Sequence, residues 1–237
     1  MRTNAKFPAA LGLCSIALIA AAAPTQAPAH LPVWRGLEAG VLQQVNYART
    51  HPYEYAQGLR EYRSHIRGGI LYLPGDPGGI YTNEGTAAVD EAIEFLEAQE
   101  PLPPLTEGQI LALAAGDHAD AQGRMGEVGH ISSDGADPGD RVKRRGGDIY
   151  VGESISYGFD DAENVVRQLI VDDGVPDRGH RDLLFTRDFR FAGVGCGTHR
   201  EYRYMCVIDL SSTVNGAPEM PEWASNRGAK TFVYRGN

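Results

Sequence analysis

Cysteine, tryptophan and positive charge are all scarce in this chain. Its 237 residues include three cysteines and two tryptophans, and 22 basic residues against 31 acidic ones give a formal net charge of -9. An acidic chain without a long basic run is a poor binder of nucleic acid, so we expect no nucleic-acid partner. The hydrophobic content of 42% is sufficient for a core, which indicates a globular protein.

Several catalytic signatures are also missing. The sequence contains no Gly-x-Ser-x-Gly elbow and no phosphate-binding loop. It has no His-x-x-x-His or Cys-x-x-Cys pair with the spacing of metal ligands close in sequence. Any chemistry must therefore come from residues that are far apart in the chain.

The long apolar run is confined to the N-terminus. Two basic residues precede an apolar stretch at 7–23, and small residues at 27–29 offer a cleavage site. This pattern predicts a secretory signal peptide over residues 1–29, cut before His30. The alternative is a retained membrane helix, but the run is short for a bilayer and no stop-transfer pattern follows. We expect a secreted protein, extracellular or periplasmic, without an integral membrane anchor.

Removal of such a peptide takes Cys14 away and leaves Cys196 and Cys206. They lie in two β-prone runs on either side of a polar turn at 198–201, so a hairpin would place them on facing strands. In an oxidising compartment this predicts one disulfide, worth about 2–3 kcal/mol for so short a loop. Two buried free thiols are the alternative.

Four stretches carry apolar residues at helical spacing. They predict helices over 37–50, 53–65, 86–98 and 106–123. Thr106 and Gln109 have the Thr-x-x-Gln spacing of a capping box at the start of the last helix. Residues 68–85 are rich in glycine and proline, which predicts loops with at most a short ribbon. The segment could be a lid or a plain insertion.

The acidic stretch SSDGADPGDRVKRRGG at 132–147 has two interpretations. Its acids lack the regular spacing of a calcium loop. Asp137 as N-cap, Pro138 at the first helical position and Asp140 two residues later predict instead a short helix through Arg145. The basic residues at its end then form a solvated helix face.

A second cap and two strands follow. Asp160 and Glu163 predict the start of a helix with a buried apolar stripe at 165–170. Residues 190–195 and 202–210 are predicted strands. Helices around a few late strands indicate an α+β fold.

Five polar residues stand next to glycines or at element ends, where the backbone can approach a cleft closely. They are His130, Glu153, Asp172, Asp173 and His180. The two imidazoles, with two of these three carboxylates, could hold a divalent metal or act as general acid and base on a bound water.

The other histidines have simpler interpretations. His118 is predicted to pack against the core from a helix, and the remaining ones, His30, His51, His65 and His199, to occupy surface or turn positions. Arg178 and Arg181, which flank His180, are expected to cap the loop; anion binding is the alternative.

The order of these motifs resembles the CAP superfamily of cysteine-rich secretory, antigen 5 and pathogenesis-related proteins, in particular its secreted bacterial SCP-like members. Five stretches carry the resemblance: VNYARTHPYEYA, LALAAGDHADAQGRMGEVGHISSDG, VGESISYG, VDDGVPDRGHRDLLF and FAGVGCGTHREYRYMCVIDLS. It implies a CAP domain over 30–212 with an insertion near 67–85, and a C-terminal tail at 213–237. The implied fold is a three-layer α-β-α sandwich with a late antiparallel sheet.

The resemblance also implies a cleft with two histidines and two acids. His130 matches the first histidine, Glu153 the acid of the Gly-Glu-Asn motif and His180 the histidine of the Gly-His motif. Here the second motif reads Gly-Glu-Ser, and the family's second glutamate has no clean match. Asp172 or, after a shift of one residue, Asp173 takes its place, and either is one methylene shorter.

Three functional hypotheses follow. The first is a non-enzymatic binding protein that holds a divalent metal, Zn²⁺, through His130 and His180 and accommodates a lipid, sterol or peptide in its groove. The second is a metal-assisted, protease-like hydrolase in which Glu153 and Asp172 are catalytic. The third is a structural role, in which the four polar residues hold loops together. The sequence does not predict the oligomeric state.

Overall fold

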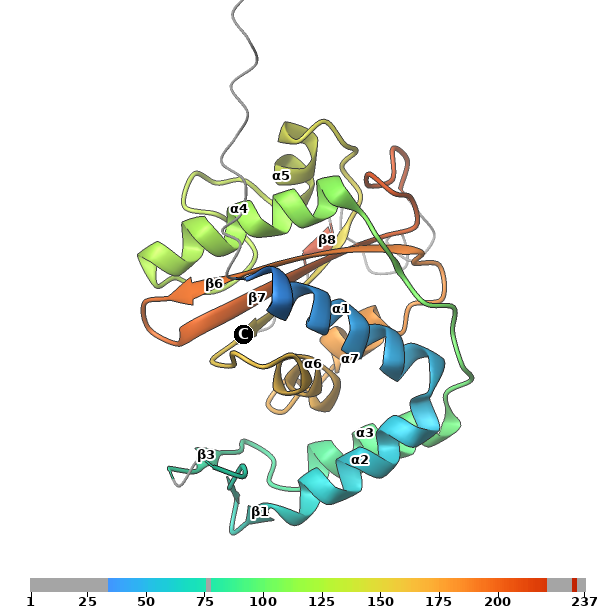
Figure 1. The fold of residues 1–237 in the computed structure, drawn as a ribbon, viewed down its shortest axis with the longest axis vertical. Helices are drawn as coiled ribbons and strands as arrows, with labels where there is room; N and C mark the ends of the chain where they lie inside the picture. The colour runs from blue at the N-terminus through green and yellow to red at the C-terminus, as the bar shows by residue number, and fades with distance from the viewer. Residues whose placement is uncertain (1–33, 76–77, 221–231, 234–237) are drawn as a thin grey trace, which may run out of the picture.

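The computed structural model describes residues 34–75, 78–220 and 232–233 of the chain (Figure 1). The proposed signal peptide, His30 and Cys14 lie outside the described residues. Within these ranges the helices are α1 (Arg35–Thr50), α2 (Pro52–Ser64), α3 (Ala87–Ala98), α4 (Gln109–Met125), α5 (Pro138–Arg144), α6 (Ala162–Val171) and α7 (Gly179–Leu184). No described helix is long and apolar enough to cross a membrane.

Two sheets accompany these helices. The larger one has the strand order β4-β6-β7-β5-β8. Its strands are β4 (Thr106–Glu107), β5 (Gly152–Tyr157), β6 (Phe191–His199), β7 (Arg203–Ser211) and β8 (Phe232–Val233). The smaller sheet is built from β1 (Ile66–Arg67), β2 (Ile70–Leu71) and β3 (Ile80–Tyr81), in that order.

Helices cover both faces of the larger sheet, which gives the expected α-β-α sandwich of an α+β protein (Figure 1). Helices α4 and α5 lie on one face, and α1, α6 and α7 lie on the other. Helices α2 and α3 pack together beyond α1 and α6. The main apolar core fills the α1/α6 side of the sheet, and two smaller apolar clusters lie under α4.

The antiparallel β6–β7 hairpin is the centre of the sheet. Cys196 and Cys206 face each other in its register and form a disulfide, as predicted. On the α4 side, a Cβ added at Gly193 or Gly195 would lie 2.0 Å from the backbone of Ala112 or 2.2 Å from that of Gly116. These glycines therefore let α4 pack directly on the strand.

Two predicted helix starts are wrong. Residues 106–107 form a strand, because the amide groups of Thr106 and Gly108 donate to the carbonyls of Arg190 and Ala192 at 2.8 Å and join the edge of β6. Helix α4 then starts after Gly108 without a side-chain cap, so the Thr106 capping box does not form. The cap of α6 is Asp161, one residue after the predicted Asp160.

The Asp137 cap is confirmed. The Asp137 carboxylate accepts a hydrogen bond from the Asp140 amide, and the Asp140 side chain accepts one from the Asp137 amide, so a complete capping box opens α5. The short ribbon expected in the insertion is also present, as the sheet β1-β2-β3. Strand β5 and helix α7, which carry Glu153 and His180, are features that the sequence analysis did not identify.

Candidate functional site

His130 and Glu153 form the first histidine–carboxylate pair. His130 follows α4 on a loop, and Glu153 is the second residue of strand β5, which lies between β7 and β8 in the sheet. The distance from His130 Nδ1 to Glu153 Oε1 is 2.8 Å, and both side chains are buried. Since the strand fixes the carboxylate, it also fixes the imidazole ring that is bonded to it.

Arg141, on α5, holds this pair in place. Its guanidinium forms an ion pair with Glu153 Oε2 and donates to the carbonyls of His130 and Ala136 at 2.9 and 3.0 Å. Burial of Glu153 opposes its ionisation, but the charge of Arg141 and the hydrogen bond of His130 lower the pKa of this carboxyl to about 2. Glu153 is therefore an anion with both oxygens engaged.

A second buried acid stands next to Glu153. Asp209 on β7 is its direct cross-strand partner and is fully buried. Neither carboxylate oxygen of Asp209 has a hydrogen-bond donor among the described residues. Burial, followed by the negative charge of Glu153, raises the pKa of Asp209 well above its usual value. Next to the ionised Glu153, the site thus holds a second carboxyl group whose charged form is disfavoured by burial.

His180 and Asp172 form the other histidine–carboxylate pair. Asp172 ends α6 in the left-handed region at φ 58°, and His180 lies in the first turn of α7. His180 Nδ1 lies 2.6 Å from Asp172 Oδ1, while the backbone amide of His180 donates to Asp172 Oδ2 at 2.9 Å. One carboxylate therefore orients both the ring and the backbone of His180.

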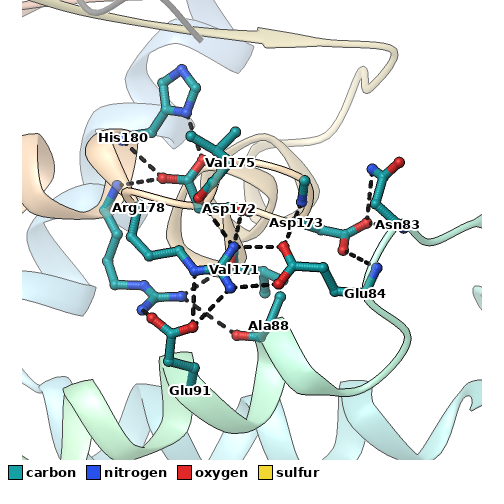
Figure 2. Close-up of polar contacts among 12 residues, drawn as sticks. Asn83, Glu84, Ala88, Glu91, Val171, Asp172, Asp173, Val175, Arg178 and His180 are labelled. Atoms are coloured by element: carbon teal, nitrogen blue, oxygen red, sulfur yellow. Dashed lines mark hydrogen bonds and ion pairs between the residues drawn. The ribbon is translucent and has the colours of Figure 1, made fainter. Parts of the chain in front are cut away.

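Asp173 points in another direction. Its carboxylate accepts hydrogen bonds from the amide groups of Asn83 at 2.7 Å and Glu84 at 2.9 Å, on the segment before α3 (Figure 2). Of the two neighbouring acids, Asp172 is the one bonded to His180.

Arg178 ties the same loop to α3 and to the segment before it (Figure 2). Its guanidinium donates to Glu84 at 2.6 Å, to Glu91 at 2.7 Å and to the carbonyl of Asp172 at 2.9 Å. Arg181 likewise donates to the carbonyls of Ile170 and Val171. Both arginines hold the loop, which agrees with the predicted capping role.

One pocket joins the two pairs. His130, Asp172 and His180 line it together with Tyr157 and Gln168, and its volume is about 560 Å³. Glu153 is absent from this lining, since it lies buried next to His130. The structure therefore brings the predicted histidines to one cleft, with one acid in the wall and the other in the interior.

The side chains of the cleft include two histidines that could bind a metal. In proteins, a histidine that binds metal commonly has its other ring nitrogen hydrogen-bonded to a carboxylate, which fixes the tautomer. His130 and His180 both have this arrangement at Nδ1, so Nε2 is the atom through which each would bind. No group of three His, Cys, Asp or Glu side chains in the described ranges could hold a metal ion. A metal here would have two imidazole ligands from the protein.

Two further histidines support the loops. His118 is buried on α4, as predicted, and bonds Ser132 Oγ and the carbonyl of Gly129 at 2.9 Å, on either side of His130. His199 was predicted at the surface or in a turn, and this is wrong. It is buried at the end of β6, where its Nε2 bonds the carbonyl of Glu127 at 2.8 Å.

The family model described as the cysteine-rich secretory protein family, CAP, matches residues 42–210. This chain belongs to the CAP family. The CAP match ends before the last described residues and includes all four residues of the two histidine–carboxylate pairs.

Among solved structures, this CAP domain is similar to an extracellular protein containing an SCP domain from Bacillus anthracis str. Ames. The identity is 24% and the TM-score 0.38, and the alignment covers 49% of this chain and 36% of the other, so the match spans about a third of that protein. No curated protein matches.

The departure of this CAP chain from the family's Gly-Glu-Asn motif is visible in the structure. Ser154 replaces the asparagine, and its hydroxyl is buried without a hydrogen-bond partner among the described residues. The substitution therefore removes the side-chain amide without adding a described contact in its place.

Proposed function

We propose that this chain is a secreted CAP-domain binding protein rather than an enzyme. In this proposal the cleft binds a divalent metal, Zn²⁺, through His130 and His180, and the adjoining groove takes a lipid or peptide ligand. The observation that carries it is the matched pair of imidazoles, each held at Nδ1 by a buried carboxylate and both lining one pocket.

The zinc proposal is supported by the chemistry of the two rings. Neutral imidazole nitrogen is a good zinc ligand, and a carboxylate at the other nitrogen raises its basicity. Two protein ligands leave coordination positions for water or for a group of the bound ligand. Such a site would bind metal more weakly than a closed four-ligand site and would couple metal to ligand binding.

The hydrolase hypothesis has less support from the geometry. Glu153, the expected base, is fully buried, and its oxygens are engaged by His130 and Arg141. A general base must reach the proton that it removes, directly or through one water. Asp172 also has both oxygens engaged by His180. The proposed function therefore assigns these acids to orientation of the histidines.

A calorimetric zinc titration at neutral pH tests the metal proposal. We expect the protein without residues 1–29 to bind Zn²⁺ with a dissociation constant in the micromolar range or below. The His130→Ala/His180→Ala variant should lose this binding. His51→Ala is the matched control, since His51 is exposed and outside the cleft lining. Absence of heat with the unchanged protein, or equal binding by the double variant, would refute the metal site.

A further inference from the structure

A second pocket adjoins the histidine pocket on the side of the insertion. Its volume is about 170 Å³, and its apolar lining comes mainly from the small sheet and the helices next to it: Ile66, Leu71, Ile80, Val89, Phe159 and Val171. We call it the insertion pocket. It shares three lining residues, Asn83, Gln168 and Asp173, with the histidine pocket. We call the two adjoining pockets together the groove, and each of them has both polar and apolar lining residues.

The junction between the two pockets is held in a defined position. Asp173 accepts hydrogen bonds from the backbone of Asn83 and Glu84, and Glu84 in turn accepts one from the amide of Gly174 at 2.8 Å (Figure 2). Arg178 adds ion pairs with Glu84 and Glu91. Because these contacts join the insertion side to the loop of His180, the insertion pocket is held in a fixed position relative to the histidine.

Large apolar side chains also stand exposed along the groove. Val128 and Tyr202 line the histidine pocket and are 60% and 49% exposed, while Tyr81 lines the insertion pocket and is 83% exposed. A small ligand enclosed by its pocket would not need them, whereas protein interfaces are enriched in tyrosine and other aromatic side chains. The rim thus favours an occupant that extends beyond the two pockets.

The mixture of polar and apolar lining residues indicates the chemistry of that occupant. Asn83, Gln168 and Asp173 lie between the apolar residues of the insertion pocket and the histidine pocket, where the two histidines are accompanied by Ile155, Leu169 and Val175. A long acyl chain would lie against these polar groups at a cost. An extended peptide instead alternates apolar side chains with a polar backbone. The net charge of -9 favours a neutral or basic peptide over an acidic one.

We propose that the insertion pocket binds one aliphatic side chain of an extended, neutral or basic peptide whose backbone continues across the histidine pocket. The proposal rests on the groove of the proposed function and names its ligand class. It does not depend on the metal, because none of the described residues that line the insertion pocket is a histidine.

Methyl NMR of the metal-free protein without residues 1–29 tests the inference. The probes are acetyl-Gly-Gly-Leu-Gly-Gly-amide, the matched alanine peptide, and decanoate. We expect the leucine peptide to shift the methyl signals of Ile66, Leu71 and Ile80 and to bind at least tenfold more tightly than the alanine peptide, since three further carbons are buried at about 0.8 kcal/mol each.

Two variants and a control localise the effect. Ile66→Trp fills the insertion pocket and Ile80→Asn makes it polar, and each is expected to remove the preference for leucine. Tyr72→Ser, on an exposed residue of the same segment outside the pocket lining, is expected to keep it. The methyl spectrum and melting temperature of each variant show whether it is folded, and a folded variant that retains the preference would refute the assignment.

The remaining outcomes are equally decisive. Equal affinity for the two peptides, or no shift at the three methyl groups, overturns the proposal. A stronger response to decanoate than to the leucine peptide also overturns it, and identifies the groove as a lipid site. In His130→Ala/His180→Ala the leucine preference should persist, so failure of the zinc site and failure of the peptide site are distinguishable.

Discussion

The two histidine–carboxylate pairs of this protein have the same chemistry and different supports. In both, a carboxylate oxygen lies within 2.8 Å of the imidazole Nδ1. Glu153 belongs to strand β5, which is paired on both sides within the sheet, and its charge is neutralised by the buried Arg141. Asp172 stands at a helix end, in a loop whose backbone has left-handed residues at Asp172 and Arg178. That loop is fixed from outside, by Glu84 and Glu91.

We call the His130 side of the cleft the rigid wall, because the contacts that support it are buried in the sheet, whereas the His180 side depends in part on contacts with partly exposed residues. The sheet holds His130 through contacts that are fully buried, so changing them disturbs the whole fold. The contacts of His180 with Asp172 come from one loop, and the partners of Arg178 are partly exposed. Changes there should affect binding more than stability.

The largest effect is expected for Glu153→Gln. The change leaves the guanidinium of Arg141 buried without its charged partner, which costs about 3–5 kcal/mol of unfolding free energy. Chemical denaturation at pH 7 measures this loss of unfolding free energy.

The pKa of Glu153 is lowered to about 2 in the folded protein. This acid therefore stabilises the fold above its unfolded pKa of about 4.3, and its contribution is lost as the pH falls toward 2. The variant should lack that acid-induced loss.

The double variant Glu153→Gln/Arg141→Met is the control for this interpretation. Removal of both members of the pair eliminates the unpaired buried charge and should recover part of the lost stability. If the double variant were destabilised by the sum of the two single changes, Arg141 and Glu153 would not be coupled, and the rigid wall of the cleft would need another explanation.

A smaller effect should distinguish Asp172 from Asp173 on the His180 side of the cleft. Asp172→Asn weakens the orientation of the His180 ring and is expected to reduce zinc affinity about tenfold, the lower end for loss of such a partner. Asp173→Asn changes a carboxylate bonded to Asn83 and Glu84 and should leave zinc affinity within twofold. Titrations of both variants under identical conditions measure the ratio. Equal losses would contradict the separate roles of the two acids.

The sequence predicts the parts of the site that depend on local signals. Glycines next to His130, Glu153 and His180, together with the order of the motifs, identify the two histidines and their acids. Local spacing also predicts the Asp137 cap and the cysteine pair. It fails at 106–108, where pairing with the edge of β6 overrides the helix pattern.

Local sequence patterns do not predict contacts between residues that are far apart in the chain. Arg141 stands just before the basic residues 143–145, which are interpreted as a solvated helix face, yet it is buried and forms an ion pair with Glu153. Pairing of Arg178 with Glu84 connects residues that are 94 positions apart. The sequence does point to Asp209, because this acid lies within the otherwise apolar strand segment MCVIDL. Such an acid must be paired or protonated when it is buried.

The smallest predicted effect is that of Asp209→Asn. It tests the protonation of the carboxyl groups next to His130. Burial and the charge of Glu153 raise its pKa above the unfolded value of about 3.9. Its favourable contribution to stability is therefore complete below that pH and is lost as the pH rises toward the folded pKa.

In Asp209→Asn the side chain is neutral at every pH, and its amide can donate a hydrogen bond to Glu153. We expect the variant to melt about 2–4 °C above the unchanged protein at pH 7, which corresponds to about 1 kcal/mol in a domain of this size. Near pH 4 the two melting temperatures should converge. A lower melting temperature at pH 7 would show that the ionised Asp209 stabilises the fold, and the shared negative charge beside His130 would then have to be balanced by Arg141 alone.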